Sequence, residues 1–352
     1  MKNPYARFLS LKESLYKRLF GKVYLSDRAP LLLRSYARQV KAKLAKIRAD
    51  IVFSPGTIPI AYLECKQPIV FWTDSTFGGM VNFYPEFSDL CRGTIKNGNA
   101  LEQAALDRCT MAIYASDWAA KSAKNLYSTD PKKLDVIPFG ANMECNRSFQ
   151  DIKNLVDSRT REKCKLLFVG MDWARKGGEI VLKVAQSLNE NGLNTELKIV
   201  GCKPNFQAKK PDFVQVLGFV NKNTKEGSNL LNNLFGESHF LILPSKAEAY
   251  GVVFCESNSF GVPCIASDVG GIPTVIKKEV NGNLFSPAAS IDEYCSYIMD
   301  LLSDYAKYRS LALSSFHEYK TRLNWQTSGT VLKKLLTKIM HSKHTHVLSP
   351  LW

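Results

Sequence analysis

The sequence predicts an α/β protein made of two halves, each built on a parallel sheet. Short apolar runs alternate with helical patterns over residues 51–137, a polar stretch over 141–164 interrupts this rhythm, and the alternation resumes over 166–267. Strands that alternate with helices, with polar or glycine turns at the strand ends, are typical of a parallel sheet covered on both faces. A chain of 352 residues is long enough for two such domains with separate cores.

The composition is that of a globular chain without a membrane span. Hydrophobic residues make up 45% and charged residues 22% of the sequence. No apolar run reaches 18 residues and no signal-peptide pattern opens the chain, so we expect a cytoplasmic protein that at most lies on a membrane. The nine cysteines show no Cys-x-x-Cys spacing, which indicates reduced, buried thiols and neither a disulfide framework nor a metal site.

The positive charge is concentrated at the N-terminus. The whole chain has a net charge of +15, and residues 1–50 contain 13 Lys and Arg against three Asp and Glu. Two amphipathic helices are predicted there, 8–20 and 32–48, with apolar stripes formed by Phe8, Leu11, Leu15 and Leu19 and by Leu33, Tyr36, Val40, Leu44 and Ile47. Such helices can rest on an anionic membrane surface or pack on a core with a solvated basic face, and both interpretations stay open. No nucleic-acid-binding motif accompanies the charge, so nucleic acid is not an expected partner.

The strands and helices can be placed in order along the chain. The expected strands are 51–53, 69–72, 111–114 and 136–137 in the first half and 166–170, 196–201, 214–218, 240–243 and 264–267 in the second, with helical patterns between them such as 100–108 and 118–126. In open α/β sheets ligands bind beyond the carboxyl ends of the strands. Gly170, Gly201, Gly218 and Pro244 should therefore open toward a ligand-binding cleft.

One stretch, 241–260, reads as strand, loop and helix, with the helix starting near Gly251. The first turn of a helix offers unpaired N–H groups and a positive dipole end, which suit a phosphate. The dipole supplies only about 0.3–1 kcal/mol, so a basic side chain is needed to hold a dianion. Arg175 and Lys176 lie just past strand 166–170, before a helix that starts near Gly178. Each hydrogen bond from them to a phosphate is worth about 1.5–3 kcal/mol.

Two acids border the same stretch. Glu248 lies in the loop and Glu256 in the expected helix, and eight residues of continuous helix correspond to a rise of about 12 Å and about 80° of rotation. That is too far for a hydrolase pair, whose carboxylates lie about 5–9.5 Å apart. The spacing suits two acids that grip different parts of one long ligand, while the simpler alternative is a pair of surface glutamates beside a helix.

The run EAYGVVFCE, followed by SFGVPCIASDVGGIPTVI and NGNLF, resembles the Glu-x7-Glu signature of the retaining glycosyltransferases of family 4. This resemblance implies a GT-B fold, in which two Rossmann-like domains face each other across a cleft, and transfer of a sugar from a nucleotide-diphosphate donor to an acceptor hydroxyl with retention of configuration. It implies that Glu248 meets the donor sugar and Glu256 the ribose. The diphosphate is expected on Arg175 and Lys176 because of their place after the strand, and not because of the resemblance. The remaining expected donor-binding positions are Tyr250, Gly251, Val252, Gly218, Phe219 and Gly170.

No metal or other cofactor is expected, because the cations and the helix start can stabilise the charge that grows on the departing diphosphate. The acceptor is expected to be a glycan, a lipid or a small molecule, as in glycan, polysaccharide or glycolipid synthesis.

Three departures from the family pattern affect the expectation. Relatives commonly have an arginine directly after the glycine at position 170, where this chain has Met171. They also open with a strand and a glycine-rich loop, whereas the first strand expected here begins at Ile51, so the N-terminal domain appears in the sequence as shortened. Where relatives place a histidine on the acceptor side, this chain has Asp74 and Ser75, and Asp74 can either orient a hydroxyl or cap a turn. The shortened N-terminus and Met171 favour, as the alternative, a non-catalytic nucleotide-sugar-binding or interaction protein. A GT-B epimerase is a third interpretation and ranks last, because no acid-base set for epimerisation is found in the sequence.

The expected organisation is an acceptor-side domain (1–143), a linker (144–164), a nucleotide-sugar-binding domain (165–320), a last helix crossing back to the first domain (321–340) and a tail (341–352). The crossing is expected at the RLNWQ run, Arg322 to Gln326, by the same resemblance. The tail contains His341, His344 and His346, which we interpret as part of a polar terminus.

Overall fold

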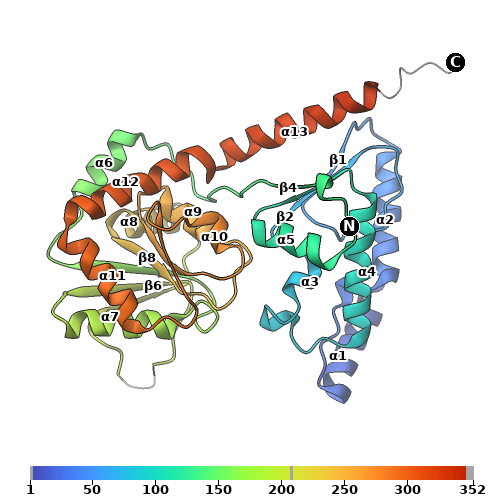
Figure 1. Cartoon of the computed structure of the whole chain (residues 1–352). Coiled ribbons are helices and arrows are strands. Elements are labelled where there is room, and N and C mark those ends of the chain that lie inside the picture. Colours follow the sequence, from blue (N-terminus) through green and yellow to red (C-terminus); the bar gives the residue numbers. More distant parts are fainter. Residues whose placement is uncertain (1–2, 207–208, 346–352) are drawn as a thin grey trace. The chain divides into compact units, whose positions relative to one another are not determined.

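The computed structural model describes residues 3–206 and 209–345 and divides into two compact units. The first unit comprises Met1–Ile137 and the chain from Gly329 on, and the second comprises Pro138–Ser328. Each unit contains a parallel sheet with helices packed against it (Figure 1). The predicted α/β class with two parallel sheets is therefore confirmed.

The sheet of the first unit has four parallel strands in the order β1-β2-β3-β4. Their bounds are β1 Val52–Ser54, β2 Ile69–Thr73, β3 Met111–Tyr114 and β4 Leu134–Val136, and the helices of this unit are α1 Ala6–Phe20, η1 Ser26–Arg28, α2 Pro30–Leu44, α3 Phe77–Met80, η2 Pro85–Phe87, α4 Arg92–Arg108, α5 Asp117–Leu126 and η3 Pro131–Lys133. Leu33 of α2, Phe71 of β2 and Leu101 of α4 are fully buried in one core cluster. No strand precedes β1 among residues 3–51, as predicted.

The sheet of the second unit has six parallel strands in the order β10-β9-β8-β5-β6-β7. Its elements are α6 Phe149–Asp157, β5 Cys164–Val169, α7 Gly178–Glu190, β6 Thr195–Val200, β7 Val214–Gly218, α8 Lys225–Glu237, β8 Phe240–Leu243, α9 Val252–Asn258, β9 Cys264–Ser267, α10 Ile272–Val275, β10 Gly282–Phe285, α11 Ile291–Ser303 and α12 Tyr305–Arg322. Helices α7 and α11 pack together on one face of the sheet, and α8 and α9, backed by α6 and α12, cover the other (Figure 1). The strand β8 is buried at every residue, which its apolar run FLIL explains.

The stretch 144–164, expected as a linker, is instead part of the second unit. Ser148 and Asp151 form a capping box at the start of α6, and the helix buries Ile152 and Val156 against α12 and α8. The next residue but one after the helix, Arg159, is 4% exposed and donates hydrogen bonds to the carbonyls of three residues, Gly236, Phe260 and Gly261. The sequence analysis did not predict this helix because most of its residues are polar and only a narrow stripe along it is apolar. The boundary between the units accordingly comes at Ile137, before the predicted position 143.

A second difference from the expected organisation is strand β10, which the sequence analysis did not predict. The NGNLF run contains a turn at Asn281 and then the edge strand Gly282–Phe285, which pairs in parallel with β9. A four-residue strand directly after an Asn-Gly turn signal offers too little periodicity to be recognised.

The RLNWQ run, Arg322 to Gln326, lies near the end of the second unit and is hydrogen-bonded to the residues that open it. Leu323 is fully buried and its carbonyl accepts a hydrogen bond from the Ala141 amide at 3.1 Å, while the Ser328 hydroxyl donates to the Pro138 carbonyl at 2.7 Å. The ring of Trp325 lies 5.5 Å from that of Phe139. Helix α13, Trp325–Thr345, starts here and continues into the first unit.

Among residues 3–206 and 209–345, no helix has the length and apolarity needed to cross a bilayer. In the same part of the chain, no group of three or more metal-binding side chains is found. Residues 346–352 of the predicted tail, which include His346, lie outside the described residues. Residues 341–345 are the end of α13.

Candidate active site

The predicted cations and the first predicted acid meet at the carboxyl ends of two adjacent strands. Strand β5 pairs directly with β8, so the loops that follow them are neighbours. The main chains of these loops are joined by a hydrogen bond from the Lys246 amide to the Arg175 carbonyl at 2.8 Å. The sheet order thus brings residues 175–176 and 248 together although 72 positions separate Lys176 from Glu248.

Both cations converge on one carboxylate oxygen. The Lys176 ammonium donates a hydrogen bond to Glu248 Oε2, and Arg175 Nη1 lies 3.6 Å from the same atom. Arg175 Nη1 also donates to the Ala247 carbonyl at 2.8 Å, which fixes the guanidinium beside the loop. The exposed fractions of the three side chains are 11% for Lys176, 12% for Glu248 and 19% for Arg175. This is a largely buried charge cluster, where electrostatic interactions are stronger than at a solvated surface.

Two glycines give the cluster its room. A Cβ at position 170 would come within 3.1 Å of Lys176 Cγ, so glycine lets the lysine stem pass the end of β5. Gly251 has φ +88°, and a Cβ there would lie 2.5 Å from the Phe254 ring and 3.3 Å from Glu248 Cγ. A larger residue at Gly251 would be strained by its backbone and would press on the glutamate.

Gly251 is the N-cap of α9, as predicted, but the helix has only seven residues. Its dipole is correspondingly small, because few peptide units add to it. Gly251 is buried and Val252, the first helical residue, is half-buried.

Tyr250 was expected to contact the donor, and its side chain does not lie where it could. The residue is 1% exposed, and its hydroxyl donates a hydrogen bond to the Phe139 carbonyl at 2.7 Å. Burial raises the pKa of this phenol well above its usual value. The ring therefore stabilises the second unit and does not offer its hydroxyl to a ligand.

The second acid, Glu256, lies on α9 and is 7% exposed. Lys222 Nζ donates a hydrogen bond to Glu256 Oε1 at 3.1 Å. Burial raises the pKa of the Glu256 carboxyl, while the ammonium of Lys222 and the backbone N–H of Asn142 oppose that shift. Sequence analysis did not find these two partners, because nothing in the sequence links residues 142 and 222 to 256.

A cavity of about 520 Å³ adjoins this second acid through Lys222. Its lining is polar and comes from the segment that opens the second unit and from the start of α8: Asn142, Met143, Glu144, Asn146, Lys222, Asn223, Thr224, Lys225, Ser228 and Asn232. The amide, hydroxyl and ammonium groups there can bond to hydroxyls or to anionic oxygens of a ligand.

Two apolar side chains are unusually exposed at the carboxyl ends of the same sheet. Phe219, directly after the Gly218 that ends β7, is 68% exposed, and Met171, after Gly170, is 72% exposed. The Met171 side chain is therefore not packed against the protein, and it adds no positive charge to the cluster of Arg175, Lys176 and Glu248.

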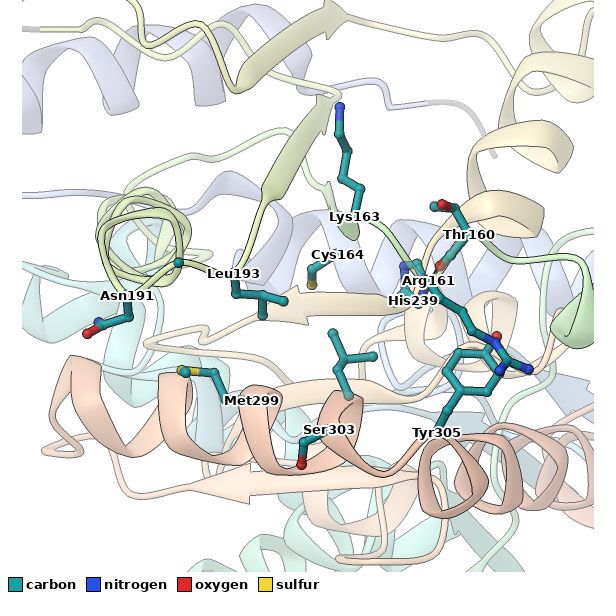
Figure 2. Close-up of a pocket in the computed structure, with 12 residues that line it drawn as sticks. Thr160, Arg161, Lys163, Cys164, Asn191, Leu193, His239, Met299, Ser303 and Tyr305 are labelled. Carbon is teal, nitrogen blue, oxygen red and sulfur yellow. Dashed lines mark hydrogen bonds between the residues drawn. The ribbon is translucent and has the colours of Figure 1, made fainter.

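A different cavity, of about 310 Å³, lies at the amino ends of the strands of the same sheet (Figure 2). Its lining comes from residues that precede strands, including Thr160, Leu193 and His239, and from the end of α11 and the start of α12. His239 Nδ1 accepts a hydrogen bond from the Lys165 amide at 3.0 Å and Nε2 bonds to the Thr160 carbonyl at 2.8 Å. Burial lowers the pKa of His239 to about 4, so the neutral ring uses both nitrogens for structure. Ligands of open α/β sheets bind at the carboxyl ends of the strands, so we do not assign the active site to this cavity.

In the first unit, Asp74 and Ser75 follow β2 as predicted, and both are half-buried. The Ser75 hydroxyl donates a hydrogen bond to Asp74 Oδ1 at 3.0 Å. The cap of the next helix, α3, is Thr76, whose hydroxyl accepts from the Gly79 amide at 3.0 Å. Asp74 is therefore not that cap.

Beneath this loop lies Glu102 of α4, a buried acid that sequence analysis missed. Its Oε2 accepts hydrogen bonds from the Thr57 hydroxyl at 3.1 Å and the Phe77 amide at 3.4 Å, and its Oε1 has no hydrogen-bond partner among the described residues. Burial raises the pKa of the Glu102 carboxyl to about 7. Glu102 thus ties the loop after β1 to the start of α3.

Comparison with known proteins places these features in a family context. The family model described as "Glycosyl transferases group 1" matches residues 153–314, inside the second unit. Among curated proteins, the D-inositol 3-phosphate glycosyltransferase of Mycobacterium marinum is 25% identical over 241 residues, which is 66% of this chain and 50% of that protein. An uncharacterized glycosyltransferase of Methanocaldococcus jannaschii is 28% identical over 233 residues, or 62% and 56% of the two chains. The chain thus spans about half the length of the curated relatives it matches.

Solved structures show the same fold. Sucrose-phosphate synthase from Thermosynechococcus elongatus superposes with a TM-score of 0.67 at 18% identity, covering 88% of this chain and 79% of that one. Anabaena HepE in complex with UDP-glucose gives 0.63 at 16% identity, with 88% and 84% covered. WaaG, a glycosyltransferase involved in lipopolysaccharide biosynthesis, gives 0.61 at 19%, with 85% and 81% covered. The predicted GT-B fold is confirmed, and the matches support a glycosyltransferase family.

Proposed function

We propose that this protein is a glycosyltransferase that moves a sugar from a nucleotide-diphosphate donor to an acceptor hydroxyl. The observation that supports this most directly is the convergence of Arg175 and Lys176 on Glu248 beside Gly251, within the region matched by the glycosyltransferase family model. Cations and an acid in one buried cluster can serve the two parts of such a donor, the diphosphate and the sugar. The complex of HepE with UDP-glucose supports a nucleotide sugar as the class of donor.

The diphosphate is assigned to the cations. Lys176 and Arg175 stabilise the negative charge that grows on the departing diphosphate, and each charge-assisted hydrogen bond contributes about 1.5–3 kcal/mol. The N–H groups at the start of α9 contribute a smaller share, because that helix has only seven residues. These groups stabilise the leaving charge by themselves, so the proposal includes no metal.

The remaining parts of the donor are assigned to the two acids and to the backbone near the strand ends. Glu248 orients the donor sugar, and Glu256 accepts hydrogen bonds from the ribose hydroxyls, where Lys222 now bonds to it. The backbone positions proposed to border the donor are Gly170, Gly218, Phe219, Gly251 and Val252.

We propose retention of configuration, by resemblance to family 4. In the front-face route, the bond between the anomeric carbon and the leaving phosphate oxygen breaks and the acceptor oxygen bonds to the same face of the sugar. The acceptor proton passes to the leaving phosphate, so no covalent nucleophile is needed. Asp74 and Ser75 are the candidates for contact with the acceptor, which we propose to be a glycan, a lipid or a small molecule in glycan, polysaccharide or glycolipid synthesis. The proposed location is the cytoplasm, including the inner membrane surface.

A second candidate is a nucleotide-sugar-binding protein with little or no turnover. It is favoured by Met171, which leaves an exposed thioether where relatives commonly have an arginine. Loss of that one cation would weaken stabilisation of the diphosphate and leave donor binding by Glu256 in place.

The two candidates separate in one experiment. A thermal-shift screen over nucleotide sugars identifies the donor, and the donor is then assayed for transfer to a broad acceptor panel and for hydrolysis. We expect turnover that Lys176→Ala reduces by roughly 100-fold, the scale of losing one charge-stabilising group. Lys183→Ala, which removes an exposed lysine of α7 in the same unit, should leave turnover unchanged. A donor that binds without any turnover would favour the binding protein, and equal activity of both lysine variants would refute the site.

A further inference from the structure

Helix α1 has an apolar strip that faces away from the core of its unit. Phe8, Leu11, Leu15 and Leu19 are 61%, 61%, 45% and 65% exposed, respectively. Their spacing of three, four and four residues places them within about 80° on one side of the helix. Exposed apolar patches of this kind mark interaction surfaces, whereas single exposed apolar residues need no explanation.

The strip is separate from the surface by which α1 packs. That packing surface is formed by Leu9, 2% exposed, which joins Tyr24, Ala29 and Leu32 in a small core with Tyr16 against it. Leu9 and Tyr16 lie about 60° or more from the strip around the helix. The second basic helix, α2, differs, because its stripe packs into the core through Leu33, Val40 and Leu44. The sequence pattern is similar in both helices, and only α1 leaves its stripe uncovered.

Positive charge borders the strip. Arg7 and Arg18 are exposed and lie within about 40° of Leu11 on the helix surface. The acid of this helix, Glu13, points to the other side, where its Oε1 accepts a hydrogen bond from the Ser26 amide at 3.1 Å. Residues 1–50 together have 13 basic side chains and three acidic ones.

We infer that α1 lies on an anionic lipid bilayer, with Phe8, Leu11, Leu15 and Leu19 in the boundary between headgroups and acyl chains and with Arg7 and Arg18 on lipid phosphates. An exposed apolar strip with basic edges is the arrangement by which amphipathic helices bind in the plane of a membrane. A second copy of this chain is a poorer occupant, because pairing two such strips would bring basic edges close to basic edges. This inference selects between the two interpretations of the basic helices, and it does not depend on the proposed transferase chemistry.

The test uses the full-length protein and sedimentation with vesicles of phosphatidylcholine alone or mixed with phosphatidylglycerol. We expect binding to the mixed vesicles that falls steeply as salt is raised, and little binding to phosphatidylcholine alone. Replacing Leu11, Leu15 and Leu19 together by glutamine, which keeps helix propensity, should abolish binding. Arg7→Gln with Arg18→Gln should weaken it roughly fivefold for each arginine.

The matched control is Leu31→Gln with Ile47→Gln, which removes two exposed apolar side chains of the same unit that lie outside the strip, 46% and 60% exposed. It should bind like the wild type, and thermal unfolding should show that all variants are folded. Equal binding of the strip variant and the control would overturn the inference, and so would equal binding to charged and neutral vesicles. A concentration-dependent dimer in sedimentation that the strip variant abolishes, without vesicle binding by the wild type, would instead assign the strip to a second copy.

Discussion

The contact between Lys176 and Glu248 predicts that one substitution strengthens diphosphate binding while it weakens catalysis. Glu248 Oε2 accepts a hydrogen bond from Lys176 and lies 3.6 Å from Arg175 Nη1. A diphosphate on the same cations competes with this carboxylate. Glu248→Gln removes the competing charge and keeps the size and hydrogen-bonding oxygen of the side chain.

The magnitude follows from the number of donors. A hydrogen bond between charged groups contributes about 1.5–3 kcal/mol, but the lysine ammonium has three donors and can serve a carboxylate and a phosphate together. We therefore expect a gain of about 1–1.5 kcal/mol, which is about five- to tenfold tighter binding. Turnover should fall by roughly 100-fold in the same variant, because the donor sugar loses the group proposed to orient it.

The assay is isothermal titration of the nucleoside diphosphate that the donor screen selects. The matched control is Glu237→Gln, which removes another carboxylate of the second unit that pairs with two lysines, Lys165 and Lys198, next to the amino end of β8. Glu237→Gln should leave the affinity unchanged. Diphosphate affinity that is unchanged or weaker in Glu248→Gln would show that the carboxylate does not compete for these cations.

Three further predictions concern buried titratable groups. Glu256→Ala should weaken nucleotide binding roughly 10- to 100-fold by titration, because ribose hydroxyls lose a charged acceptor, and normal affinity would contradict its assignment. The pKa of Glu102 is raised to about 7 from 4.5, so the folded state keeps the proton to higher pH than the unfolded state does. The free energy of unfolding should therefore fall by at most roughly 3 kcal/mol from pH 4.5 to 7. Glu102→Gln should remove that slope in denaturant titrations. His239 has its pKa lowered to about 4 from 6.5, so its contribution is present above pH 6.5 and should be lost as pH falls toward 4, again by at most roughly 3 kcal/mol. Because the two slopes have opposite signs between pH 4.5 and 6.5, each is measured as the difference between the wild type and Glu102→Gln or His239→Gln, and a difference that does not vary with pH would refute the corresponding assignment.

Much of the fold follows from local patterns in the sequence. The strands Met111–Tyr114, Val214–Gly218, Phe240–Leu243 and Cys264–Ser267 have the predicted bounds, because each is a short apolar run ended by a turn residue. Helix α6 and strand β10 were missed for the opposite reason. The first buries only Ile152 and Val156 along an otherwise polar segment, and the second is a short edge strand.

The site was predictable only where neighbouring strands bring two local motifs together. The loop of residues 175–176 and the loop of Glu248 each have a recognisable composition, but their contact depends on the pairing of β5 with β8, which the sequence does not specify. The partners of Glu256, Lys222 and the Asn142 amide, come from unmarked loops. Tyr250 shows the converse, because its place beside Gly251 suggested a ligand contact and its ring is buried in the protein core.

The pairing of Pro138 with Ser328 has a consequence for how this chain can be divided. Residues 138–328 form one uninterrupted segment whose two ends are hydrogen-bonded to each other, and it contains a complete six-stranded sheet. A segment with adjoining ends can be excised, expressed by itself or exchanged for that of a relative at a single location. Chimaeras joined at these two positions would therefore allow the proposed donor-binding residues to be transplanted together without redesigning the rest of the molecule.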